Sequence, residues 1–146
     1  MRRRMFFKKK EKKEIDVTTL KGAFENRFGK TDRESFLIVV QAFFNELNKD
    51  SLVTIPMSLN TNLESPEYQP RFVQLPDGRV GISIITDDEY MNQFDDSTNM
   101  KVTMSHLVQM MCQNEICGGI VINPFSKSHC YLPKESILQI LDSKRQ

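Results

Sequence analysis

The sequence contains no long apolar run. The longest are FLIVV at residues 36–40 and IVI at residues 120–122, whereas a membrane-spanning helix needs about 20 predominantly apolar residues. The N-terminus begins with basic residues but lacks the apolar segment and the small-residue cleavage site of a secretory signal. We therefore expect a cytoplasmic protein.

Cysteine is scarce, with only Cys112, Cys117 and Cys130 in 146 residues. An odd number of cysteines in a chain of this length does not form a disulfide framework, which agrees with a reducing compartment. A zinc site would need four converging ligands and a tighter pair such as Cys-x2-Cys, which this spacing lacks even with His129 included. The sequence predicts structural cysteines, no metal and no cofactor.

Catalytic motifs are missing as well. The sequence has no nucleophile elbow, zinc-protease helix, phosphate-binding loop or dinucleotide fingerprint. Cys130 or Ser126 would need a base, and the histidines are His106 and His129. Because neighbouring strand residues point to opposite faces, the adjacent His129 and Cys130 form a poor pair. A cysteine- or serine-dependent hydrolase therefore ranks third among the functions considered.

Basic charge is concentrated at the N-terminus. Residues 1–14 contain eight basic side chains, which are Arg2, Arg3, Arg4, Lys8, Lys9, Lys10, Lys12 and Lys13. Two glutamates reduce their net charge to +6, so the remaining 132 residues carry −5 of the overall +1. This composition predicts a disordered basic arm over residues 1–14, followed by one domain over residues 15–146.

Two interpretations of this arm stay open. It is either a solvated tail or a weak anchor for an anionic membrane or nucleic acid. Near an anionic bilayer each Lys or Arg contributes about 1 kcal/mol, and the same charges bind nucleic acid with a steep salt dependence. Composition alone does not choose between these partners.

Amphipathic periodicity predicts the helices. A single apolar stripe predicts a helix over residues 31–50, with Thr31 and Glu34 as its capping box. The stripe consists of Phe36, Val40, Phe43, Phe44 and Leu47. Further helices are expected over residues 16–29, from Thr86 to about residue 94, from Ser105 to about residue 114, and after Pro133.

Alternating and apolar runs predict the strands. A Pro-Asp-Gly turn between RFVQL and RVGISII predicts a hairpin, and the apolar residues 117–123 predict a buried central strand. Pro56 favours a strand edge or end, and residues 59–70 an exposed loop. Shorter strands are expected at residues 53–57, 101–104 and 129–132. Together these patterns predict a single α+β domain, with one mixed sheet of about five or six strands and packed helices.

The segment INPFSKS, at residues 122–128, forms a turn between two of these strands. Pro124 fixes its backbone and Asn123 satisfies local amides. Loops on rigid scaffolds are common binding positions. Asn123, Pro124 and Phe125 are therefore candidates for a recognition surface.

The order of four sequence pieces resembles the N-terminal domain of the bacterial SseB family, named for enhanced serine sensitivity. They are AFFNELNKDSLVTIP, ISIITDDEYMNQF, KVTMSHLVQMM and GGIVINPFSKSHCYLPKESILQIL, and the resemblance covers about residues 32–142. It implies a compact α+β domain of a bacterial cytoplasm, with no established cofactor or reaction. Longer members carry a second, C-terminal domain that has no counterpart in this chain, and the basic arm lies outside the resemblance.

Two functions follow as expectations. The leading one is a non-enzymatic interaction module with a protein or ligand partner. The alternative is a peripheral binder of anionic membrane or nucleic acid through the basic arm.

Overall fold

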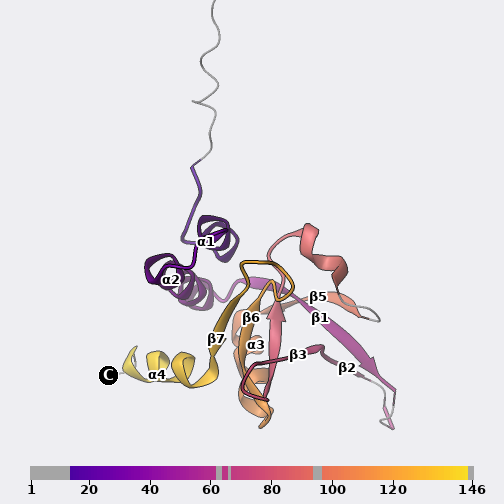
Figure 1. Ribbon diagram of the computed structural model, residues 1–146. Coiled ribbons are helices and arrows are strands. Elements are labelled where there is room, and N and C mark those ends of the chain that lie inside the picture. The colour runs from indigo at the N-terminus through magenta and orange to yellow at the C-terminus, as the bar shows by residue number, and fades with distance from the viewer. Residues whose placement is uncertain (1–13, 62–63, 66, 94–96, 145–146) are drawn as a thin grey trace, which may run out of the picture.

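Seven strands form two sheets within the residues that this computed structural model describes, which are 14–61, 64–65, 67–93 and 97–144 (Figure 1). The predicted α+β class is confirmed. The single sheet of five or six strands is not, because the described residues form two sheets that only an isolated bridge between Thr54 and Ile85 joins.

The first sheet is antiparallel and has three strands, in the order β2 (Glu67–Pro70), β1 (Leu52–Asn60) and β5 (Thr98–Thr103). Strand β2 occupies part of the segment predicted as a loop. Pro56 lies inside the central strand β1, where the sequence predicts an edge or a strand end.

The ladder of β1 explains how Pro56 is accommodated. Strand β5 pairs with the first part of β1 up to Met57, and β2 pairs only from Met57 onward. The Pro56 carbonyl accepts a hydrogen bond from the Arg71 amide at 2.9 Å. Because the nitrogen and the carbonyl of one strand residue point to the same side, the Pro56 nitrogen also faces the β2 side of β1. The β2 ladder begins only at Met57, so the missing N–H of Pro56 lies just beyond the end of that ladder.

The second sheet is mixed and has four strands, in the order β3 (Phe72–Gln74), β4 (Val80–Ile84), β6 (Cys117–Ile122) and β7 (Cys130–Pro133). Strands β3 and β4 form the predicted antiparallel hairpin, β4 and β6 are parallel, and β6 and β7 are antiparallel. Every residue of β6 is buried, which confirms the predicted central strand.

The described helices are α1 (Leu20–Arg27), α2 (Arg33–Lys49), α3 (Met104–Gln113), α4 (Lys134–Lys144) and the 3-10 helix η2 (Asp88–Gln93). The sequence predicts an α-helix at η2, but the Tyr90 amide bonds to the Asp87 carbonyl three residues back at 3.0 Å, the spacing of a 3-10 turn. No described helix has the length and apolar composition needed to cross a bilayer.

Two helix caps differ from the predicted ones. The N-cap of α2 is Asp32 rather than Thr31, and its carboxylate accepts from the Ser35 amide at 2.8 Å. The N-cap of α3 is Thr103 rather than Ser105, and its hydroxyl accepts from the amide of His106. In both cases an alternative capping residue lies one or two positions earlier or later, so local sequence leaves the choice open.

The hydrophobic core lies on one face of the four-stranded sheet. It joins buried residues of β4 and β6, such as Ile82 and Ile120, to Phe43 of α2 and Leu107 of α3. The most buried positions of α2 include Val39, whereas the predicted Val40 is only partly buried. Figure 1 shows α3 behind this sheet and no described helix in front of it.

Candidate functional site

The loop after β6 is held by the side chain of Asn123, which is fully buried and has a left-handed backbone with φ of 50°. Its Oδ1 accepts from the Thr86 amide at 3.0 Å, and its Nδ2 donates to the Thr86 hydroxyl at 2.8 Å. Its own amide donates to the Ile84 carbonyl at 2.9 Å. Asn123 therefore ties this loop to the segment after β4.

This arrangement separates the three candidate residues of the loop. The amide that Asn123 satisfies belongs to Thr86, 37 positions away, and not to its own turn as predicted. Because the Asn123 side chain is buried, it supports the loop and does not face solvent. Pro124 is half-buried and Phe125 is 56% exposed, so these two residues remain at the surface.

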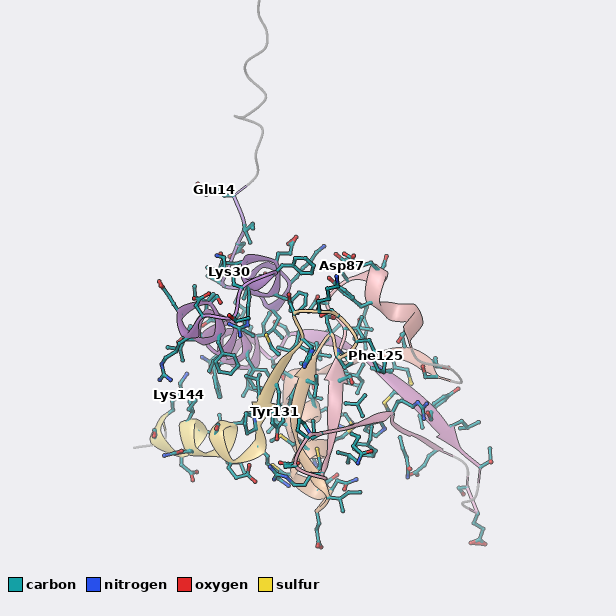
Figure 2. All side chains as sticks on the ribbon, viewed as in Figure 1. Glu14, Lys30, Asp87, Phe125, Tyr131 and Lys144 are labelled. Carbon is teal, nitrogen blue, oxygen red and sulfur yellow. The ribbon has the colours of Figure 1, made fainter. Side chains whose placement is uncertain are left out.

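Pro124 and Phe125 line a groove of about 470 Å³ on the helix-free face of the four-stranded sheet. Residues 71–76 form a second side of this groove, the loop also contributes His129, and the sheet contributes Val121 and Tyr131. Figure 2 shows Phe125 on the loop and Tyr131 further along the same face. A concave surface of this size with mostly apolar lining is typical of a binding site.

The polar side chains that line the groove are Arg71, Gln74, His129 and Tyr131, and no carboxylate is among its lining residues. The Arg71 side chain is exposed and makes no ion pair within the described residues. Arg71 therefore gives this part of the groove a local positive charge.

The candidate nucleophiles do not meet a base in the described structure. The His129 ring Nδ1 lies 3.2 Å from the backbone carbonyl of Ser126, while the buried Ser126 hydroxyl has no hydrogen-bond partner within the described residues. The Cys130 thiol contacts the Ser128 carbonyl at 3.7 Å. His106 is exposed on α3. Within the described residues, neither Ser126 nor Cys130 therefore has the hydrogen-bonded base that nucleophilic catalysis requires.

The cysteines fall into two environments. Cys117 and Cys130 are buried, as the sequence predicts, but Cys112 is exposed on α3. Burial raises the pKa of the Cys117 and Cys130 thiols. Within the described ranges, no group of three or more His, Cys, Asp or Glu side chains could hold a metal ion.

This difference predicts the order of thiol modification. Because the reactive species is the thiolate and access is required, Cys112 should react quickly with a disulfide reagent in native protein, while Cys117 and Cys130 react only on unfolding. Spectrophotometric thiol counting should give a single fast thiol per chain. Cys112→Ser should abolish the fast phase. A fast thiol that remains in that variant would show that Cys117 or Cys130 is accessible.

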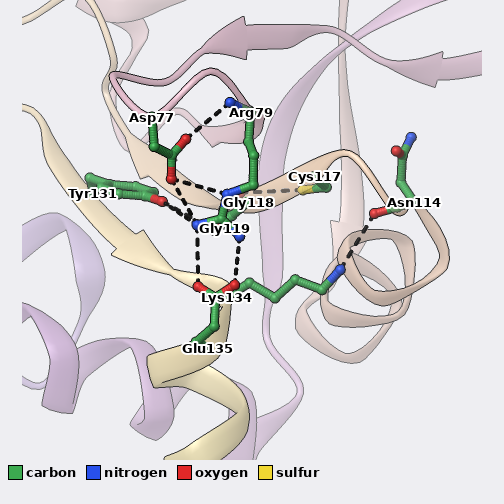
Figure 3. Close-up of polar contacts among 9 residues, drawn as sticks. All are labelled: Asp77, Arg79, Asn114, Cys117, Gly118, Gly119, Tyr131, Lys134 and Glu135. Atoms are coloured by element: carbon green, nitrogen blue, oxygen red, sulfur yellow. Dashed lines mark hydrogen bonds and ion pairs between the residues drawn. The ribbon is translucent and has the colours of Figure 1, made fainter.

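A polar cluster braces the hairpin beside the groove (Figure 3). Arg79 donates to Asp77 Oδ2 from Nε at 3.0 Å and pairs with both carboxylate oxygens of Glu135 on α4. The groove residue Tyr131 donates its hydroxyl proton to the Gly118 carbonyl at 3.2 Å. Gly118 occupies the bulge of β6, where a Cβ would lie 2.6 Å from Arg79 Nε. The glycine therefore leaves room for the arginine that joins the hairpin to α4.

The Arg79 cluster predicts a pH-dependent contribution to stability. Hydrogen bonds from Arg79 hold the pKa values of Asp77 and Glu135 below their ordinary values. A lowered folded-state pKa gives stability above the ordinary carboxyl pKa, and this stability is lost as the pH falls through the lowered value. Arg79→Gln should therefore melt below the wild type at neutral pH and converge with it in acid.

Thermal melts followed by circular dichroism, at a series of pH values from neutral to acid, test the prediction. The effect should be modest and reduced by salt, because both carboxylates are exposed. Glu135→Gln, which removes one of the two acceptors, should flatten the pH dependence less than Arg79→Gln does. A melting difference that stays constant from neutral to acid pH would contradict the charge-based account.

The remaining predicted site residues are the eight basic side chains of the arm, and all of them lie outside the described residues. Sequence patterns alone did not predict that residues 71–76 form one side of the groove. The hairpin was predicted, but its position beside the 124–129 loop depends on tertiary packing. Comparison of the chain with family models, curated proteins and solved structures finds no match.

Proposed function

We propose that the protein is a non-enzymatic interaction module that holds a segment of a partner protein in the groove between residues 71–76 and the 124–129 loop. The observation that carries this proposal is an exposed aromatic ring, Phe125, at the side of a mostly apolar groove on a loop anchored by the buried Asn123. Aromatic side chains in well-formed pockets commonly dominate the binding energy of protein interfaces.

The resemblance to the SseB N-terminal domain is part of the same proposal. Its support is the order of the sequence pieces described above, which favours a domain of a bacterial cytoplasm with no established cofactor or reaction. Neither the family nor the compartment is needed for the groove to bind a partner.

Site-specific photo-crosslinking in the cells that naturally produce the protein tests the groove. A photoreactive phenylalanine at position 125 should capture a defined partner. The same probe at Phe28, which is 55% exposed and lies outside the groove, should not capture it. The two positions match in residue type and exposure, so a difference reports on location.

The variants Phe125→Ala and Phe28→Ala make the same comparison without a photoreactive side chain. Phe125→Ala should keep its melting temperature within about 2 °C, since exposed substitutions cost little, and should lose the partner. Binding through the basic arm would give the opposite result: deletion of residues 1–14 would abolish capture while Phe125→Ala would not. That outcome would overturn the groove proposal.

A further inference from the structure

We infer that the partner segment crosses the helix-free face of the four-stranded sheet above β4, with an acidic side chain paired with Arg71 and an apolar side chain against Phe125. This inference rests on the proposed function and specifies the chemistry of the segment that the groove takes. It follows from the small residues of β4, from the position of the groove across the sheet, and from the charge at one of its ends.

The groove lies above β4, the strand between its two sides. Val73 of β3 is opposite Gly81 of β4. Val121 of β6 is opposite Ser83 of β4. Because opposite residues on neighbouring strands point to the same face, Gly81 and Ser83 belong to the face that the groove occupies. Both of these β4 residues are small and buried, so the larger side chains of the flanking strands rise on either side of them.

The missing side chain of Gly81 lets the two sides of the groove approach each other. A Cβ on Gly81 would lie 3.1 Å from Leu75 Cδ2 and 3.1 Å from Val121 Cγ2. Leu75 and Val121 therefore border the space above Gly81, and both line the groove. They form an apolar floor on which a side chain of the partner segment can pack.

Strand direction places Arg71 and the loop after β6 at the same end of the groove. Strand β3 is antiparallel to β4, whereas β6 is parallel to it. The start of β3 and the end of β6 therefore lie at the same end of the sheet. Arg71 directly precedes β3, and Phe125 lies in the loop that follows β6. Two strand spacings of about 4.8 Å separate β3 from β6, so a short segment above β4 can contact both residues.

Charge at this end of the groove is complementary to an acidic side chain. Arg71 forms no ion pair within the described residues, and the loop opposite carries the exposed Lys127 and His129. Asp87, which follows β4 at this end of the sheet, is already paired with Lys21 at 3.6 Å. An aspartate or glutamate of the partner can form a bidentate pair with the Arg71 guanidinium. The basic arm of this chain is a poor occupant, because its net charge is +6.

The test uses a displayed library of random nine-residue peptides, selected on the full-length protein. Selected peptides should share an acidic residue next to an apolar one. Their affinity should fall about tenfold with Arg71→Gln, which corresponds to the loss of one charge-assisted pair. Arg33→Gln is the matched control and should bind normally, because Arg33 is also exposed but lies outside the groove.

Charge reversal tests the pair itself. Arg71→Glu should weaken binding of a selected acidic peptide more than Arg71→Gln does. Replacing the acidic residue of the peptide by lysine should then restore binding to Arg71→Glu but not to the wild type. Higher salt should weaken wild-type binding more than binding by Arg71→Gln, because salt screens exposed charges. In nuclear magnetic resonance spectra, the amide signals of Gly81 and Val121 should shift when the peptide binds.

Three outcomes would contradict the inference, and they separate it from the proposed function. Peptides that need Phe125 but show no acidic preference, or that bind Arg71→Gln normally, would overturn the acidic pairing and leave the groove function intact. Peptides that need Phe125 but leave the amide signals of Gly81 and Val121 unchanged would overturn the placement above β4. A library that yields no peptide, or only peptides indifferent to Phe125→Ala, would overturn both proposals.

Discussion

Gly119→Ala is expected to lower the free energy of unfolding by about 3 kcal/mol, the upper end of the usual cost of overpacking a core. A Cβ on Gly119 would lie 2.3 Å from the Leu132 carbonyl oxygen of β7 and 3.1 Å from the Lys134 amide nitrogen. Both contacts are with backbone, which cannot swing away as a side chain can. The two strands would have to separate at the point where β7 leads into α4.

Urea unfolding followed by far-ultraviolet circular dichroism measures this loss, because the chain has no tryptophan for fluorescence. Gly29→Ala is the matched control: its φ is 79° and no atom lies within 4 Å of its Cβ, so it carries backbone strain alone, about 1 kcal/mol. Gly118→Ala should fall between them, because its closest contact is the flexible Arg79 side chain. Equal losses at all three glycines would contradict a close approach of β6 and β7.

Asn123→Ala is expected to cost about 2–3 kcal/mol, through two separate effects. The Thr86 amide loses its acceptor in a partly buried site, which costs about 1–3 kcal/mol. Alanine also adopts the left-handed backbone less readily than asparagine, whose side chain tolerates it. Because Asn123 joins the groove loop to the end of β4, both effects should appear as a lower midpoint of urea unfolding.

Asn123→Gly separates the two effects, because glycine adopts φ of 50° without strain but makes no side-chain hydrogen bonds. We expect its stability to lie between those of the wild type and Asn123→Ala. If glycine is more damaging than alanine, the strain contribution is wrong. If alanine is harmless, the Asn123–Thr86 hydrogen bonds do not hold the loop.

Partner binding connects this stability argument to the groove. Under conditions in which Asn123→Gly remains folded, the loop that carries Phe125 loses its anchor while the ring itself is unchanged. If the proposed function holds, capture of the partner should then fall, although Asn123 does not line the groove. That result would make Asn123 a positioning residue for the proposed binding surface.

Some features of the loop after β6 could be predicted from the sequence and others could not. Gly, Asn and Pro around an apolar run predicted the turn, because those residue types act through their own backbone preferences. Asn123 and Phe125 have separate roles in this loop. The Asn123 side chain is hydrogen-bonded to Thr86, 37 positions away, whereas the Phe125 ring lies at the surface. No local pattern records that distant partner.

Local patterns were enough to predict the elements whose signals lie within a few residues. The apolar stripe of α2, the uninterrupted run of β6 and the Pro-Asp-Gly turn of the hairpin each follow from spacing along a few residues. Tertiary structure decided the division into two sheets, the central position of Pro56 and the groove beside residues 71–76. Each of these depends on which strands pair and on which side their ladders end, and strand pairing joins residues that are far apart in the chain.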